Sequence, residues 1–147
     1  MKKPQISVLC QALIELIWYF GPKGLNGECC ENLSMPEFMA LSSIAGIENC
    51  PVQSIGYSLG FTKSGATRIV NRLESKGYVK KNKSSADARV CCVEITSSGA
   101  KVIKDTDATY LQNLEKLLAN MPAKSAMKAK EVLTSLAKSI EEMKESI

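Results

Sequence analysis

Apolar residues recur at helical spacing in the first twenty positions of the chain. They are Ile6, Leu9, Leu13, Leu16, Ile17 and Phe20. This spacing predicts an amphipathic helix. Gln11 and Glu15 interrupt the apolar run, and no small-residue cleavage site follows it, so a secretory signal is not expected despite Lys2 and Lys3. We therefore expect a cytoplasmic protein with reduced cysteines and no membrane partner.

The next helical pattern starts at Ser34-Met-Pro-Glu37. The Ser34 side chain can accept a hydrogen bond from the Glu37 amide, and Glu37 can return one to Ser34. Pro36 is tolerated in a first helical turn. The predicted helix buries Phe38, Leu41 and Ile44 or Ala45. Before it, the breakers of residues 21–27 predict a loop that runs on to about Leu33.

A pair of shorter helices follows. Residues 45–50 are expected to connect, and Pro51 is expected to open a helix that Gly60 stops. Thr62 then suits an N-cap and Gly77 a terminator. Between them, one helical face is apolar and consists of Ala66, Ile69, Val70 and Leu73. The opposite face is polar and consists of Ser64, Thr67, Arg68, Asn71, Arg72 and Ser75.

The rest of the chain predicts a β-hairpin and two helices. Residues 79–82 and 90–95 have strand character and flank the polar turn 83–89. A long helix follows Thr96, whose hydroxyl can cap Ser98 or Gly99, and another follows Pro122. Both helices carry apolar stripes near a seven-residue spacing, which favours packing against other helices. Together with the first helix they form more apolar surface than one small domain can bury, so a homodimer is expected.

Charge is concentrated on the second short helix and the hairpin. The chain has 19 Lys and Arg against 15 Asp and Glu. Residues 62–89 hold eight of the basic side chains and two of the acidic ones, a net charge of +6, which leaves −2 for all other residues. Such an asymmetry is typical of proteins that neutralise phosphates. Arginine and asparagine can also bind guanine and adenine through two hydrogen bonds.

The chain contains no histidine, which excludes Cys-His and Ser-His catalytic pairs and most zinc sites. Of the six cysteines, Cys10 and Cys50 are expected to be buried apolar residues. Strand alternation would place Cys91 in the core with Val93, and Cys92 outward beside Glu94. Cys92 would then be an exposed bystander or a partner for another cysteine.

Cys29 and Cys30 differ because they lie in the glycine-rich loop, between Glu28 and Glu31. A flexible backbone can turn both sulfurs toward one soft ion, such as trivalent arsenic, mercury, cadmium or copper(I), or toward zinc if further thiolates are supplied. The neighbouring glutamates would raise the thiol pKa values and so disfavour fast oxidation. These cysteines are the main sensor candidates and a candidate metal site, with Cys92 as a lesser one. No cofactor is required.

Residues 59–79, the Asp87-Ala-Arg89 turn and Ile95-Thr-Ser-Ser-Gly99 resemble the MarR family of winged helix-turn-helix regulators. The resemblance covers essentially the whole chain. It implies a mainly α fold with a small β hairpin, joined into a homodimer by helices from both termini. Its partner would be a palindromic operator in double-stranded DNA, and family members usually repress transcription until a small ligand or a thiol oxidant acts.

The resemblance also assigns roles to residues of this sequence. Arg89 is expected to enter the minor groove and Asp87 to orient it. Phosphate contact and simple solvation remain alternatives for the hairpin lysines. The full expected DNA-binding set is Thr62, Lys63, Ser64, Thr67, Arg68, Asn71, Arg72, Lys81, Lys83, Asp87 and Arg89. The zinc site of some relatives uses histidines and cannot be transferred.

The expected organisation is one compact domain with three regions. Residues 1–33 form a dimerisation helix and loop, residues 34–98 the winged helix-turn-helix, and residues 99–147 the C-terminal dimerisation helices. The expected function is a DNA-binding regulator, not an enzyme, that acts as a repressor relieved by a thiophile, an oxidant or an organic ligand. The rival interpretation is a thiol-based enzyme or metal-handling protein on a borrowed winged-helix fold.

Overall fold

The computed structural model describes residues 3–21, 28–30, 32–84 and 89–145. The chain divides into two compact units, residues 1–107 and 108–147. Six helices and five short strands lie within the described residues. None of these helices combines the length and apolar character needed to cross a lipid bilayer.

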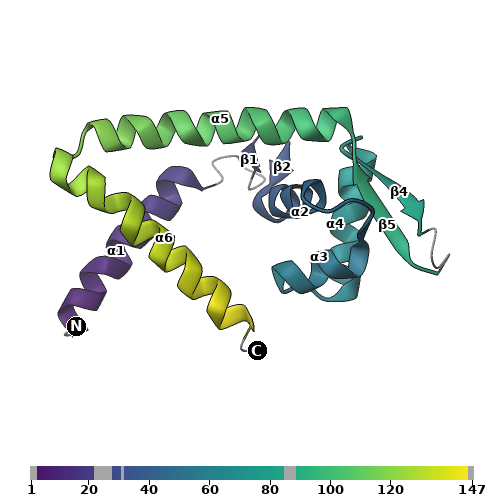
Figure 1. Ribbon diagram of the computed structural model, residues 1–147, viewed down its shortest axis with the longest axis horizontal. Coiled ribbons are helices and arrows are strands. Elements are labelled where there is room, and N and C mark those ends of the chain that lie inside the picture. The colour runs from purple at the N-terminus through teal and green to yellow at the C-terminus, as the bar shows by residue number, and fades with distance from the viewer. Residues whose placement is uncertain (1–2, 22–27, 31, 85–88, 146–147) are drawn as a thin grey trace. The chain divides into compact units, whose positions relative to one another are not determined.

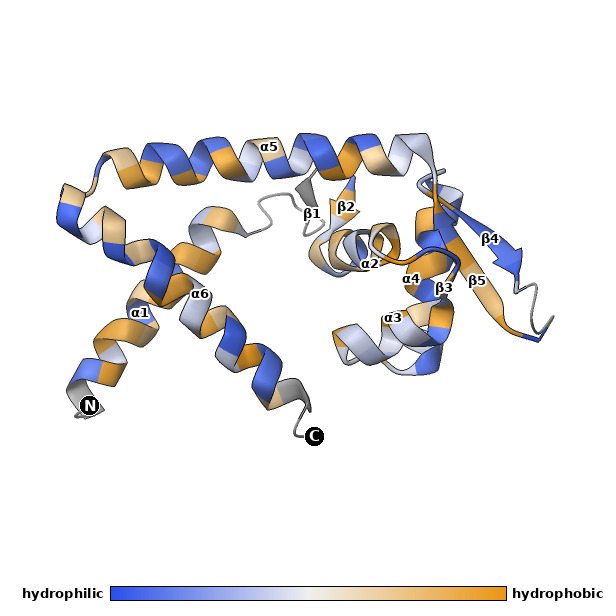
Figure 2. Cartoon of the chain, viewed as in Figure 1, coloured by the Kyte–Doolittle hydropathy of each residue, from blue (hydrophilic) through white to orange (hydrophobic). Residues whose placement is uncertain are grey.

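The first helix, α1, spans Lys3–Phe20, as the apolar spacing predicted. Large apolar side chains remain exposed along it in the single chain, including Leu9, Leu13 and Ile17. Orange apolar positions accordingly alternate with polar ones on α1 in Figure 2. Cys10 is also exposed, so the prediction that it is buried is wrong for the single chain.

The segment predicted as a continuous loop contains two strands, β1 (Glu28–Cys30) and β2 (Leu33–Ser34), which pair antiparallel. Helix α2 (Met35–Ala45) begins directly afterwards with the expected capping box. The Glu37 amide donates to Ser34 Oγ at 3.4 Å, and the Ser34 amide donates to Glu37 Oε2 at 2.8 Å. Ile44 is buried and Ala45 exposed, which decides the alternative that the sequence left open.

Helices α3 (Val52–Leu59) and α4 (Lys63–Ser75) form the helix-turn-helix. Gly60 ends α3 in the left-handed conformation at φ 68°, which a residue with a side chain rarely adopts. A Cβ on Gly56 would lie 3.0 Å from the Phe61 carbonyl oxygen, so glycine lets the turn approach α3 closely. Figure 1 shows α2, α3 and α4 beside the strands that follow them.

The hairpin strands are β4 (Val79–Lys83) and β5 (Cys91–Ile95). A third strand that the sequence did not predict, β3 (Cys50–Pro51), pairs with the other edge of β5 and gives the sheet order β3-β5-β4. The core beneath the sheet joins α2, α3, α4 and the strands. Its fully buried members include Leu33, Leu41, Ile44, Ile55, Val70, Leu73 and Val93.

The prediction that Cys91 faces the core and Cys92 faces outward is wrong. Cys92 is 3% exposed, whereas Cys91 is exposed. Pro51 of β3 lies opposite Cys92, whereas Cys91 lies beyond the end of β3 and lines a surface pocket beside Val52 and Val70, which leaves it accessible. Cys91 therefore pairs only with Lys83, near the open end of the hairpin. Cys50 is fully buried, as predicted.

Helix α5 spans Ser97–Ala119. The Gly99 amide donates to Thr96 Oγ1 at 3.1 Å, which confirms one of the two expected caps. A Cβ on Gly99 would lie 2.2 Å from the Tyr78 carbonyl oxygen, so only glycine fits against the hairpin base. Helix α6 spans Ala123–Glu145 and exposes large apolar side chains in the single chain: Val132, Leu133, Leu136, Ile140 and Met143.

Candidate nucleic-acid interface

Both ends of α4 are fixed by local hydrogen bonds. At the start, the Gly65 amide donates to Thr62 Oγ1 at 3.1 Å, as the N-cap prediction required. At the end, the Tyr78 amide donates to the Leu73 carbonyl at 3.0 Å across Gly77, which has φ 77°. The left-handed conformation of Gly77 thus turns the chain from α4 into β4. Thr62 and Gly77 therefore set the length of α4 that is available for binding.

The two faces of α4 separate as the sequence predicted. Its apolar residues Ala66, Ile69, Val70 and Leu73 are buried. Its polar residues Ser64, Thr67, Arg68, Asn71 and Arg72 are exposed. Among the described residues, neither the Arg68 nor the Arg72 guanidinium forms an ion pair. These donors are therefore available to phosphates or to base edges.

The hairpin contributes further positive charge beside α4. Strand β4 is strongly polar and β5 largely apolar, as the blue and orange arrows of Figure 2 show. Lys80 and Lys83 are exposed on β4, and Arg89 is exposed just before β5. Asp87, the expected partner of Arg89, lies outside the described residues.

Lys81 differs from the other lysines of the hairpin. Its Nζ lies 2.5 Å from Glu74 Oε2, and its backbone amide donates to Glu74 Oε1 at 3.4 Å. The hydrogen bond from the Lys81 side chain is the main cause that lowers the pKa of Glu74. The Lys81 ammonium, predicted to contact a phosphate, is therefore paired within the protein.

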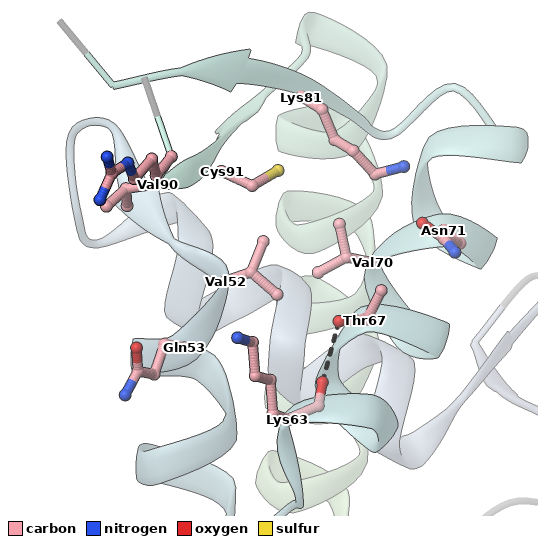
Figure 3. A pocket seen from close by; sticks show the side chains of 10 residues that line it. Val52, Gln53, Lys63, Thr67, Val70, Asn71, Lys81, Val90 and Cys91 are labelled. Atoms are coloured by element: carbon pink, nitrogen blue, oxygen red, sulfur yellow. Dashed lines mark hydrogen bonds between the residues drawn. The ribbon is translucent and has the colours of Figure 1, made fainter. Parts of the chain in front are cut away.

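A pocket of about 330 Å³ opens between the start of α3, α4 and the hairpin. Figure 3 shows Val52 and Val70 in its apolar interior, with Cys91 and Lys81 on the hairpin side and Gln53 and Lys63 toward the helices. The Thr67 hydroxyl donates to the Lys63 carbonyl at 2.9 Å, as the dashed line in the same figure marks. Asn71, Arg89 and Val90 complete the lining. The pocket thus brings together five of the predicted DNA-binding residues: Lys63, Thr67, Asn71, Lys81 and Arg89.

Gln53 is a polar residue of this surface that the sequence analysis missed. It is exposed on the first turn of α3 and lines the pocket together with Lys63 and Thr67. The sequence could have indicated Gln53, because this polar residue follows Pro51-Val52 and so falls in the first turn of the helix before α4. Its side-chain amide can both donate and accept hydrogen bonds at a phosphate or base.

A partly buried polar network holds the end of α4 on the side of α2. Lys76 Nζ lies 2.9 Å from Glu37 Oε2 and 2.5 Å from the Asn32 carbonyl oxygen. The Tyr78 hydroxyl donates to Asn32 Oδ1 at 2.9 Å. Burial by itself would raise the pKa of Glu37, but the hydrogen bonds from Ser34 and Lys76 outweigh it and lower that pKa. This network joins the residues after β1 to α2 and to the end of α4.

The cysteines do not form a metal centre within the described part of the chain. No group of three or more Cys, Asp or Glu side chains there could hold a metal ion. Cys10, Cys50, Cys91 and Cys92 are free thiols. Burial, and then the proximity of Cys92, raises the pKa of Cys50. The backbones of Cys29 and Cys30 lie in β1, but their side chains fall outside the described atoms.

Comparison with known proteins agrees with this architecture. The MarR family model matches residues 33–91. The transcriptional repressor MprA of Escherichia coli is 30% identical over 70 residues, which are 46% of this chain and 40% of MprA. The HTH-type transcriptional regulator YfiV of Bacillus subtilis is 25% identical over 113 residues, covering 77% of this chain and 71% of its own length.

Solved structures share the fold over most of the chain. FabT of Streptococcus pneumoniae in complex with DNA superimposes with a TM-score of 0.77 at 20% identity, covering 97% of this chain and 99% of FabT. The reduced form of MarR from E. coli superimposes with a TM-score of 0.64 at 24% identity, covering 71% of this chain and 78% of MarR. With its helix-turn-helix and its hairpin wing, the chain has the winged helix-turn-helix fold, and over residues 33–91 it matches the MarR family of transcriptional regulators.

Proposed function

We propose that this regulator binds palindromic double-stranded DNA as a homodimer and represses transcription until an effector releases it. The observation that carries the proposal is the outer face of α4, where Arg68, Asn71 and Arg72 are all exposed. A capped helix that buries its apolar face and presents these side chains fits the major groove. Lys63 at the start of α4 and Lys83 and Arg89 on the hairpin supply further positive charge.

The homodimer is supported by apolar surface that the single chain leaves exposed. Most of the large apolar side chains that the single chain exposes lie on α1 and on α6. Exposed apolar surface of this extent marks a protein interaction site. A twofold dimer would present two copies of α4 to half-sites about 34–36 Å apart, one turn of B-DNA.

For the effector, we propose a thiophilic metal or metalloid bound by Cys29 and Cys30. The support is their position in the chain. Cys30 pairs with Leu33 in the small β1-β2 sheet, and Asn32 is hydrogen-bonded to Lys76 and Tyr78 at the end of α4. A shift of β1 would therefore act directly on the reading helix. An oxidant or an organic ligand remains the alternative effector.

The rival interpretation, a thiol-based enzyme or metal-handling protein, is not favoured by any relative, since the MarR family consists of transcriptional regulators. A mobility-shift assay tests the proposed function. The protein should retard a duplex from its own upstream region, and competitor DNA of unrelated sequence should not displace it. Loss of binding should follow a steep power of salt concentration, because phosphate contacts release counterions. Equal affinity for related and unrelated duplexes would contradict the proposal.

A further inference from the structure

Glu74 stands out in an otherwise basic region. Residues 62–89 contain eight basic side chains and only two acidic ones, Glu74 and Asp87. Glu74 lies on the last turn of α4, and its side chain is 40% exposed. A carboxylate on a DNA-reading helix repels phosphates, so its presence calls for a structural or functional reason.

The contacts of Glu74 provide a structural reason for its presence. Glu74 binds both the ammonium and the backbone amide of Lys81, on the far side of the turn at Gly77. Lys81 lies opposite the buried Val93 in the middle of the hairpin. The two hydrogen bonds therefore form a bridge from α4 to the centre of β4, across a glycine in the left-handed conformation.

Strand β3 pairs with the other edge of β5, and two hydrogen bonds from Thr96 fix the base of the hairpin. The Thr96 hydroxyl donates to the Gly77 carbonyl at 2.7 Å, and the Thr96 amide donates to the Tyr78 carbonyl at 3.0 Å. Both contacts lie within two residues of the turn. Lys83 and Cys91 pair further out, beyond the end of β3. The bridge from Glu74 to Lys81 thus ties the centre of β4, from which the outer hairpin extends, to α4.

We propose that Glu74 and Lys81 are positioning residues that set the angle between the reading helix and the wing, and thereby the selectivity for sequence. The proposal rests on the proposed DNA-binding function. It assigns Lys81 a role through Glu74, whereas a direct phosphate contact would be the ordinary role for a wing lysine. When the bridge is present, Arg68 on α4 and Arg89 on the wing reach their contacts in the same binding event.

The test compares two duplexes: one that the wild-type protein enriches from a random-sequence pool, and one of the same composition in scrambled order. Glu74→Gln should reduce the ratio of the two affinities by about twofold to fivefold, as expected for a partly exposed ion pair. Lys81→Met should reduce the ratio similarly. The reversed pair, Glu74→Lys with Lys81→Glu, should restore much of it.

Glu94→Gln is the matched control. Glu94 lies on β5 opposite Lys80, so its neutralisation removes a nearby negative charge and leaves the bridge intact. It should raise the affinity for both duplexes alike and leave the ratio of the two affinities unchanged. Thermal melting of each variant checks that the fold persists.

The direct-contact alternative gives opposite results. If Lys81 binds a phosphate, Glu74→Gln should raise the affinity for both duplexes and make binding more dependent on salt concentration. The reversed pair should then bind DNA more weakly than either single variant. Either outcome would overturn the positioning role. If the wild type enriches no sequence from the pool, the proposed function fails instead, so the two failures are distinct.

Discussion

Lys76 Nζ lies 2.9 Å from Glu37 Oε2 and joins the end of the reading helix to the first turn of α2. Glu37 is 4% exposed and also completes the capping box with Ser34. One carboxylate thus stabilises a helix start and holds the helix that carries the DNA-binding face. Its loss should affect stability more than any surface ion pair of the protein does.

Glu37→Gln is expected to lower the free energy of unfolding by about 1.5–3 kcal/mol, the usual worth of hydrogen bonds to a charged group. Urea unfolding of wild type and variant measures this loss of free energy. Asp105→Asn breaks an exposed pair with Lys101 one helical turn away, and should change the free energy by no more than about 0.5 kcal/mol. Equal effects of the two substitutions would contradict the structural role of Glu37.

The contribution of Glu37 to stability should also depend on pH. The pKa of Glu37 is lower in the folded protein than its ordinary value, so its contribution to stability is complete above the ordinary pKa. It is lost as the pH falls through the lowered, folded-state pKa. The difference in unfolding free energy between wild type and Glu37→Gln should therefore shrink on acidification. A difference that stays constant from neutral to acidic pH would rule this out.

Arg68→Ala is expected to weaken binding to the enriched duplex by about 1–3 kcal/mol, with little change on scrambled DNA, because it removes a base contact. Lys83→Ala should weaken both duplexes to a similar degree, because an exposed wing lysine meets only phosphates. Fluorescence anisotropy titrations at fixed salt measure both affinities. If Arg68→Ala weakens both duplexes equally, α4 does not read bases through Arg68.

Gly99→Ala tests the contact between α5 and the base of the hairpin. The added methyl would overlap the Tyr78 carbonyl, and such overpacking costs about 1–3 kcal/mol. Gly46→Ala is the control, because its nearest neighbour would be 3.8 Å away and its φ is −84°. Chemical denaturation should show a clear loss for the first and almost none for the second. A neutral Gly99→Ala would mean that the two elements pack less tightly than described.

The proposed homodimer can be tested by a single charge on α6. Ile140 is 55% exposed in the single chain and shares a helical face with Leu133 and Leu136. Ile140→Arg should therefore shift the protein toward monomer in sedimentation velocity, and truncation after Pro122 should give monomer or aggregate. Thr134→Arg, on the opposite face of the same helix, should leave the dimer intact. A dimer that survives Ile140→Arg and the truncation would place the interface elsewhere.

The proposed effector site predicts that Cys29→Ser/Cys30→Ser abolishes release from DNA by arsenite, cadmium or mercury. Cys91→Ser is the matched control, because Cys91 is exposed but lies on the wing, and it should respond like the wild type. A mobility-shift titration with each ion measures the response. If the Cys29/Cys30 variant still releases, these cysteines are not the sensor. If an aromatic acid releases the wild type and no thiophile does, the organic ligand is the effector.

The sequence alone determined the helices and the division of α4 into two faces. These features depend on residues within one or two turns of each other: the Ser34-Glu37 box, the Thr62 cap, the Gly77 terminator and apolar positions at helical spacing. The polar face, and with it most of the candidate DNA-binding residues, was therefore readable in advance.

The tertiary structure decided what depends on distant partners. Strand β3 has only two residues, too few for a pattern, yet it pairs with β5 and places Pro51 opposite the buried Cys92, while Cys91, beyond the end of β3, is exposed. The bridge between Glu74 and Lys81 forms because the turn at Gly77 folds β4 back along α4. Periodicity reports which face of an element is apolar. Which neighbour covers that face, and which charge meets which, is fixed only when segments far apart in the chain pack together.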